Sequence, residues 1–278
     1  MEKKKIKVMF DTNTYRHIID ETADENNTKE VYSFIADAIK RKEIEAFLSE
    51  TTFVIEAIVK KDRLAFMANV QPKISSTEKV RENSIDITMC IGPDEEHTVN
   101  FDECGPLREY YKKSLEMGFV IVRIPRIGGI INKEIDYSKM LVSTKENPYM
   151  DKIGDISSFI SKLGAGEYQL QNLLSPYATS MNCIYDQFKG LFDDVNKMSK
   201  DAKQTAIKKV AKVIAEFSDS EAVSVSIGMD CDAFCTNDCA KSAGETSVFS
   251  EKNVKAISEA YHFVKVSPTA LVELIKSN

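Results

Sequence analysis

The sequence predicts an α/β fold with a central, mostly parallel sheet and a large, mainly helical middle insertion. Short apolar runs near both ends of the chain alternate with segments of helical periodicity, and a long helical pattern lies between them. Alternation of this kind is typical of parallel sheets with helical crossovers. The 278 residues, 43% hydrophobic and 29% charged, can bury a sizeable core.

The first part of the chain predicts two short strands with helices after them. The apolar run 6–10 stops at Asp11, as a buried strand does before a turn. Apolar residues at helical spacing follow in 31–39. In order, the predicted elements are a strand 6–10, a helix around 31–39, a strand 46–49 and a helix from about 51 to 61. The segment from about 70 to 100 is polar and predicts irregular structure.

The middle of the chain predicts one strand and a long helical stretch. A helix from about 106 to 117 should end at Gly118, which is a typical C-terminal cap. A strand over 119–124 then enters a Pro- and Gly-punctuated loop around 125–129. From about 154 to 217 the pattern is polar and helical, with breaks near Gly164, Gly166 and Pro176.

The last quarter alternates cleanly between the two element types. The predicted elements are a helix 219–229, a strand 233–236, a helix 251–260, a strand 263–266 and a final helix to about 275. Pro268 would occupy the first turn of that last helix, where a missing N–H does no harm. This alternation is the strongest indication of a parallel sheet.

The net charge and the N-terminal residues restrict the class of protein. The formal net charge is −6, whereas proteins that grip nucleic acid by phosphate neutralisation alone are usually basic. An acidic nuclease remains compatible if the negative charge lies in a metal site and basic residues gather elsewhere. The N-terminus has no signal-peptide core, and no run approaches a membrane span, so we expect a cytoplasmic protein with no membrane partner.

The six cysteines are expected to be reduced thiols rather than a disulfide framework. Cys231, Cys235 and Cys239 recur at a spacing that fits neither zinc sites nor iron–sulfur runs. We expect these three to be small buried or half-buried side chains.

Two aspartates follow predicted strands. Asp11 comes directly after the strand 6–10, and Asp238 lies just beyond the strand 233–236. In open α/β sheets, ligands bind outside the carboxyl ends of the strands. The alternative for each residue is a turn or helix-capping role, which Asp often has.

Glu56 is a carboxylate on or beside the apolar face of the helix predicted over 51–61. A carboxylate in that position is unfavourable unless it is paired or coordinates a cation. The alternatives are an ion pair with Lys or Arg and a position at the edge of the helix.

A fourth carboxylate is predicted at the start of the helix 219–229. Ser218 and Glu221 fit the capping-box pattern, which would give Glu221 a structural role and leave Asp219 facing the strand ends. Glu221 stays a rival for this position. Several converging carboxylates repel one another, and they are reasonable around a divalent cation, since hard cations prefer oxygen ligands.

These segments resemble the PIN-domain family of metal-dependent ribonucleases. The run from Val8 to Asn13 resembles the family's opening strand with Asp-x-Asn, and Ser49 to Glu56 is similar to its second strand and acidic helix. Asp219 to Asp238 resembles its late signature, with Thr236-Asn237-Asp238 ending a strand, and 263–268 resembles the final strand and Pro-led helix. The resemblance covers roughly residues 5–70 and 215–278.

The resemblance implies a PIN-like three-layer sandwich and a hydrolase that cleaves RNA internally to leave 5′-phosphate and 3′-hydroxyl ends. Its core would comprise 1–70 and 215–278, with 71–214 as an extended, diverged middle region. Mg2+ or Mn2+ would be held by four carboxylates, namely Asp11, Glu56, Asp219 and Asp238. Asn13, Thr236 and Asn237 would support the carboxylates or contact phosphate.

The same resemblance implies partners and leaves alternatives open. The substrate would be RNA, and candidate partners are a protein inhibitor or antitoxin and a second copy of the chain. The alternatives are a non-catalytic RNA- or protein-binding module and a structure-specific DNA nuclease. Basic runs at 3–5, 40–42, 60–61 and 208–209 are usually solvated charges, but any that flank the carboxylates would be suited to the RNA backbone.

Overall fold

The computed structural model describes residues 5–70, 72–81, 84–93, 107–124, 135–179, 184–240 and 244–278. Within the hairpin 72–93 the description is of the backbone. The loop predicted around 125–129, together with Cys104 and Cys183, lies outside the described residues.

A five-stranded sheet in which every pair is parallel forms the centre of the molecule, with strand order β5-β2-β1-β6-β7. The strands are β1 (Ile6–Phe10), β2 (Ile44–Ser49), β5 (Val120–Val122), β6 (Ala233–Cys235) and β7 (Lys265–Val266). The predicted parallel α/β sheet is therefore confirmed, and β5 shows that the middle of the chain supplies one edge strand.

Both faces of this sheet are buried, because apolar residues occupy alternate and intervening positions of the strands. Val8 and Phe10 face one hydrophobic cluster, while Met9 between them faces a second cluster. Phe234 and Cys235 of β6 divide between the two clusters in the same way. Strands buried on both faces are typical of parallel sheets covered by helices. The arrangement is consistent with a three-layer sandwich.

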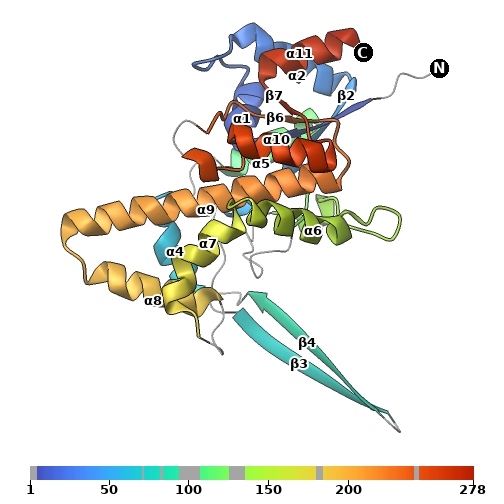
Figure 1. Ribbon diagram of the computed structural model, residues 1–278. Coiled ribbons are helices and arrows are strands. Elements are labelled where there is room, and N and C mark those ends of the chain that lie inside the picture. Colours follow the sequence, from blue (N-terminus) through green and yellow to red (C-terminus); the bar gives the residue numbers. More distant parts are fainter. Residues whose placement is uncertain are drawn as a thin grey trace.

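Helices pack on both faces of the sheet (Figure 1), and more of them contribute to the first hydrophobic cluster than to the second. The first cluster includes residues of α1 (Thr12–Asp20), α2 (Lys29–Lys40), α3 (Thr51–Val54), α5 (Leu107–Met117) and α11 (Pro268–Ser277). The second includes residues of α6 (Tyr149–Lys162), α10 (Glu251–Tyr261) and the C-terminal half of α9 (Lys200–Gly228). Short 3-10 turns occur at Tyr137–Lys139, Ser175–Tyr177 and Gly244–Thr246.

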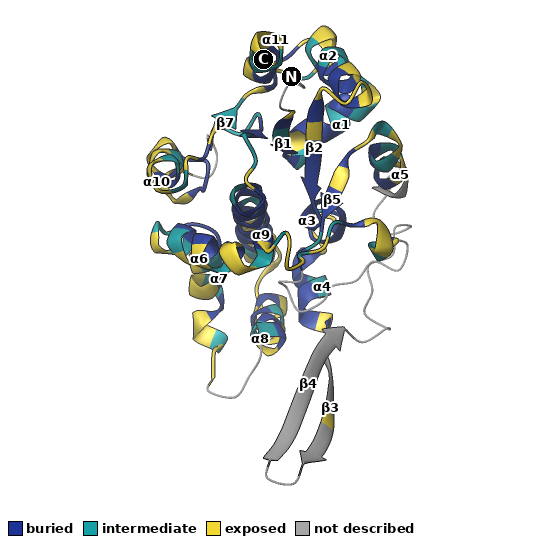
Figure 2. Ribbon diagram, turned by 90° about the vertical axis from the view of Figure 1, so that its right-hand side faces the viewer, coloured by how far each residue is buried: buried dark blue, intermediate teal, exposed yellow. Residues whose placement is uncertain are grey.

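The helix α9 joins the sheet to a group of helices (Figures 1 and 2). These helices lie beyond the carboxyl edge of the sheet, the edge at which its parallel strands have their C-terminal ends. The helix α9 packs with α4 (Arg63–Asn69), α7 (Glu167–Leu174) and α8 (Ile184–Asn196), and its residues Val210 and Phe217 join the first hydrophobic cluster. Its C-terminal half contributes Val223 and Val225 to the second cluster. One helix thus contacts both the sheet and the helical insertion.

The predicted start of a helix at Ser218 is wrong. The segment 200–228 is one continuous helix of 29 residues, and it contains no Gly or Pro before its last residue. A Ser-x-x-Glu pattern inside such a helix has no free backbone N–H groups to cap, since the preceding turn already binds them. Neither Ser218 nor Glu221 therefore has the capping role.

Two further predictions need correction. The helix expected over 51–61 ends at Val54, and a turn follows. Thr51, Thr52, Val54 and Ile55 are β-branched and lose side-chain freedom in a helix, which favours this early end. Segment 72–93 is an antiparallel hairpin of β3 (Pro72–Arg81) and β4 (Ser84–Pro93) rather than irregular structure.

The hairpin had a signal in the sequence. Apolar and polar residues alternate through 85–91, and the prolines stand only at the ends of the two strands. Period-two alternation is the pattern of an amphipathic strand, and proline at a strand end interrupts no ladder. In Figure 1 the hairpin projects away from the body of the molecule.

The helix α5 ends as predicted. Gly118 has a φ of +106° and its N–H donates to Ser114 and Leu115 carbonyls, so the cap uses a conformation that glycine adopts readily. No helix among the described residues is both long and apolar enough to cross a membrane.

Candidate functional site

The candidate site lies at the carboxyl edge of the sheet, where β1 and β6 end side by side. Asp11 follows β1 directly and its backbone N–H donates to the Cys235 carbonyl at 3.0 Å. Asp238 lies three residues beyond the end of β6. The parallel pairing of β1 with β6 therefore carries both aspartates to one edge, as the sequence predicted.

Asp11 is a buried carboxylate held by two short hydrogen bonds. It caps α1, and its Oδ1 accepts from the Thr12 backbone N–H at 2.6 Å. Its Oδ2 accepts from the Thr236 hydroxyl, also at 2.6 Å. The capping role and the site role are thus compatible, because one oxygen serves each neighbour and the carboxylate is fixed in orientation.

Thr236 connects the two aspartates. Its hydroxyl donates to Asp11 and accepts from the Asp238 backbone N–H at 2.9 Å. The side-chain N–H of Asn13 also donates to that hydroxyl at 3.3 Å, and the Asn13 Oδ1 accepts from the Asn237 backbone N–H at 3.3 Å. Asn13, Thr236 and Asn237, all expected to support the carboxylates, therefore lie in one hydrogen-bonded group with Asp11.

Sequence reasoning missed the residues that hold Asn237. Its side-chain amide donates to Asp24 at 2.6 Å and to the Tyr32 hydroxyl at 2.8 Å, and its oxygen accepts from Asn27 at 2.9 Å. Asn27 in turn accepts from Thr269 at 2.9 Å. The loop before α2 and the start of α11 thus fix the loop that carries Asp238. The polar run 24–28 was the only signal in the sequence, and it reads as an ordinary loop.

Glu56 reaches the site from the turn after α3 rather than from a helix. Its Oε1 accepts from the hydroxyl of Ser218 on α9 at 2.9 Å. Ser218, which the sequence suggested as a helix cap, instead ties this turn to the long helix. Glu56 is half-buried. Its charge raises the pKa of both Asp11 and Asp219, so the three carboxylates belong to one acidic cluster.

Asp219 is the carboxylate with the fewest compensating contacts. It lies half-buried in the middle of α9 and, among the described residues, makes no hydrogen bond and no ion pair. Burial raises the pKa of Asp219 well above its usual range, and the charges of Asp11 and Glu56 raise it further. An unpaired carboxylate among other carboxylates is unfavourable in the absence of a cation.

The pKa of Asp11 is raised for the same two reasons, burial and neighbouring negative charge. Burial and then the charge of Glu56 raise its pKa to about 7. The hydrogen bonds from Thr236 and Thr12 act in the opposite direction but do not cancel the rise. Near neutral pH the site therefore holds more negative charge than it can stabilise with its own donors.

Two other glutamates of α9 have structural partners. Glu216 is buried and its Oε2 accepts from the Val248 N–H at 3.2 Å, which holds the turn before α10. Glu221 is buried on the face of α9 that packs on α6, where the Ser157 hydroxyl donates to it at 3.4 Å. Asp219, rather than Glu221, thus shares the region of Asp11, Glu56 and Asp238.

Arg63 is a buried cation close to this cluster that sequence reasoning did not single out. Its guanidinium donates to the Ile58 carbonyl at 3.1 Å and to the Ala211 carbonyl at 3.3 Å. Burial lowers the pKa of Arg63, whereas the charges of Glu56 and Asp219 raise it. Arg63 therefore balances part of the acidic charge and joins the turn after α3 to α9.

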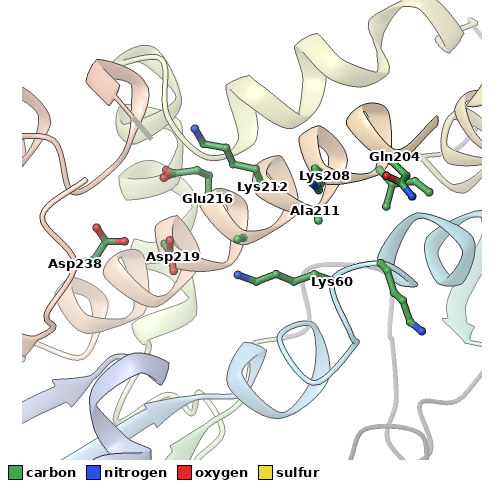
Figure 3. A pocket seen from close by; sticks show the side chains of 11 residues that line it. Lys60, Gln204, Lys208, Ala211, Lys212, Glu216, Asp219 and Asp238 are labelled. Atoms are coloured by element: carbon green, nitrogen blue, oxygen red, sulfur yellow. The ribbon is translucent and has the colours of Figure 1, made fainter. Parts of the chain in front are cut away.

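A cavity of about 720 Å³ opens beside Asp219 and Asp238 (Figure 3). The residues that line it come from the loop before α4, from α9 and from the loop after β6. They are Lys60, Lys61, Gln204, Ile207, Lys208, Ala211, Lys212, Ala215, Glu216, Asp219 and Asp238. The carboxylates occupy one end of the cavity and lysines line much of the rest.

The donors at the site are suited to a hard divalent cation by type. All four are carboxylates, and Asp219 has no other described partner. In the described part of the chain, no three His, Cys, Asp or Glu side chains stand in an arrangement that would already enclose a metal ion.

The three cysteines around β6 are free thiols. Cys235 is buried and Cys231 is half-buried, as predicted, whereas the prediction is wrong for Cys239, which is exposed in the loop after the strand. Burial raises the pKa of Cys231 to about 12, so this thiol is protonated and a poor nucleophile near neutral pH.

Comparison of the chain with protein-family models, curated proteins and solved structures finds no match. The family resemblance therefore stays a prediction from the sequence. The case for a function rests on the geometry and electrostatics of the carboxylate edge.

Proposed function

We propose that the protein is a PIN-type endoribonuclease that hydrolyses RNA phosphodiester bonds with Mg2+ or Mn2+ bound by Asp11, Glu56, Asp219 and Asp238. The observation that carries this proposal is the Asp219 carboxylate. It is half-buried, has no hydrogen-bonding partner among the described residues, lines a cavity together with Asp238, and has a pKa raised by the charges of Asp11 and Glu56. A bound divalent cation would convert this repulsion into attraction.

A divalent ion in such a site lowers the pKa of a bound water and stabilises negative charge on a phosphodiester. The residues of the chain would hold the ion and keep its ligands in place. Thr12 and Thr236 orient Asp11 through both of its oxygens, and Ser218 orients Glu56. Oriented ligands reduce the reorganisation needed on binding.

Asn13 and Asn237 would act as supporting residues. Asn13 is exposed at the first turn of α1, next to Asp11, and holds both Thr236 and Asn237. The position suits a contact with a substrate phosphate at the helix N-terminus, where backbone N–H groups favour anions. We propose RNA as that substrate and the cytoplasm as the location.

A second candidate is a non-catalytic PIN-like binding module. The separation of the carboxylates in the described structure favours it, because no group of three is already arranged around a metal position. This candidate predicts binding of RNA or protein without turnover, whether or not metal is present.

Cleavage of a mixed pool of end-labelled RNA in Mn2+ and in EDTA tests the proposal. We expect cleavage in Mn2+ or Mg2+ with 5′-phosphate and 3′-hydroxyl products, and no cleavage in EDTA. Asp219→Asn should lower the cleavage rate by ~10²-fold or more, whereas Asp155→Asn, on the exposed surface of α6, should leave it unchanged. Full activity in EDTA, or an Asp219→Asn protein as active as the wild type, would refute the assignment.

A further inference from the structure

We propose that the cavity along α9 is the binding groove for a single-stranded nucleic-acid backbone, with Lys60, Lys61 and Lys208 as phosphate contacts. The inference rests on the proposed function and goes beyond the carboxylates to the substrate path. The shared chemistry that the groove recognises is the sugar–phosphate backbone of an unpaired strand.

One continuous face of α9 forms a wall of the groove. Gln204, Lys208 and Lys212 recur at intervals of four residues, and so do Ile207, Ala211, Ala215 and Asp219. Residues four apart lie on the same side of a helix. From Gln204 to Asp219 the helix rises by about 22 Å. The groove therefore leads along the helix to Asp219 and Asp238 at the carboxyl edge of the sheet (Figure 3).

The charges along the groove change sign from one end to the other. Four lysines and three carboxylates line it, in a protein whose net charge is −6. The lysine end would attract a phosphate backbone, and the acidic end would repel it until a divalent cation is bound. Lys60 extends from its loop toward the acidic end (Figure 3).

The ammonium groups proposed as contacts are not used within the described structure. Lys60, Lys61 and Lys208 are exposed, and none forms a salt bridge with a described carboxylate. The lysines that do form salt bridges in the described part of the chain lie outside the groove and pair with carboxylates on the protein surface. Lysines without an internal partner keep their full charge available for phosphates.

The surface between the lysines is suited to a single strand. Ala211 and Ala215 project only methyl groups into the groove, and Ile207 adds an apolar side chain. A cavity of about 720 Å³ is in the range of small-ligand sites, which fits part of one strand rather than a double helix. Apolar surface next to cations is the combination that single-strand binding uses for bases and phosphates.

The test is binding of fluorescein-labelled single-stranded RNA of about twelve nucleotides, within the usual range of single-strand sites. Anisotropy is measured in EDTA, so that no cleavage occurs. The variant is Lys60→Ala with Lys208→Ala, and the matched control is Lys209→Ala, an exposed lysine one residue away that does not line the groove. Melting temperatures check that each protein is folded.

We expect the double variant to lose affinity on the order of tenfold at about 0.1 M salt, and its log K against log salt slope to fall by about 1.4, because each phosphate contact contributes about 0.7. Lys209→Ala should match the wild type. An equal loss in Lys209→Ala, an unchanged double variant, or duplex RNA bound as tightly as the single strand would overturn the proposal.

Two further arms separate related outcomes. Single-stranded DNA of the same sequence tells whether the groove takes the RNA backbone in preference or the phosphates common to both, and either result supports a single-strand groove. Because binding is measured without metal, lysine-dependent binding together with no cleavage in Mn2+ supports the groove and refutes the nuclease.

Discussion

Replacement of Asp11 by Asn should change the stability of the metal-free protein in a direction that depends on pH. Asp11 has a pKa of about 7 in the folded protein, against an ordinary value of 3.8. Well below pH 3.8 the Asp11 carboxyl is protonated in both the folded and the unfolded protein, so it does not make the free energy of unfolding depend on pH. As pH rises toward 7 the unfolded chain releases this proton more readily, so the free energy of unfolding falls; above about pH 7 the loss is complete.

The full size of this loss follows from the two pKa values. The difference between 3.8 and about 7, at about 1.4 kcal/mol per pH unit, corresponds to about 4 kcal/mol. Asn carries no charge and removes this loss, but it replaces the acceptor of the Thr236 hydroxyl, which costs about 1 kcal/mol. Asp11→Asn should therefore be more stable than the wild type by about 3 kcal/mol at pH 8 and less stable by about 0.5 kcal/mol at pH 4, where the unfolded wild type has already released part of this proton.

Urea denaturation in EDTA across pH 4 to 8 measures this crossover. Asp155→Asn serves as the control, because removing an exposed carboxylate from the surface of α6 should change stability by only about 0.5 kcal/mol. A difference in stability between Asp11→Asn and the wild type that does not vary with pH would show that folding does not raise the pKa of Asp11. So would a wild type that gains stability relative to the variant as pH rises.

Asp219→Asn should lower the single-turnover rate of RNA cleavage by ~10²-fold or more, about 2.7 kcal/mol, whereas Glu221→Gln should change it little because Glu221 packs on α6; an inactive Glu221→Gln enzyme would reverse this assignment. Gly166→Ala should destabilise the fold by about 1–3 kcal/mol, since φ is +58° and an added Cβ would lie 2.2 Å from the Ser220 hydroxyl oxygen. Gly154→Ala, in open space on α6, should instead stabilise by about 0.5–1 kcal/mol; equal melting temperatures for the two would contradict the packing argument.

The parallel sheet could be predicted because its strands are marked by local patterns. Each buried strand is a short apolar run, and the last two strands are separated by a helix with clear periodicity. Asp11 and Asp238 could be placed at the carboxyl edge for the same reason, since Asp11 comes directly after one apolar run and Asp238 lies shortly after another. These features depend on residues close together in the chain.

The features that could not be predicted depend on contacts between distant segments. Ser218 looks like a helix cap from its neighbours, and only the continuous packing of α9 against both hydrophobic clusters shows that it lies within a helix. Arg63 gives no sign in the sequence of its bond to the Ala211 carbonyl. The network around Asn237 joins three segments of the chain, and no local pattern marks it.

Anomalous scattering from crystals soaked in Mn2+ shows directly whether the carboxyl edge of the sheet binds a divalent cation. We expect a peak at this edge within about 2.1 Å of oxygens from at least two of Asp11, Asp219 and Asp238, and no such peak in Asp219→Asn crystals soaked in the same way. A peak elsewhere on the protein with none at this edge, or an unchanged peak in Asp219→Asn, would contradict the proposed metal site.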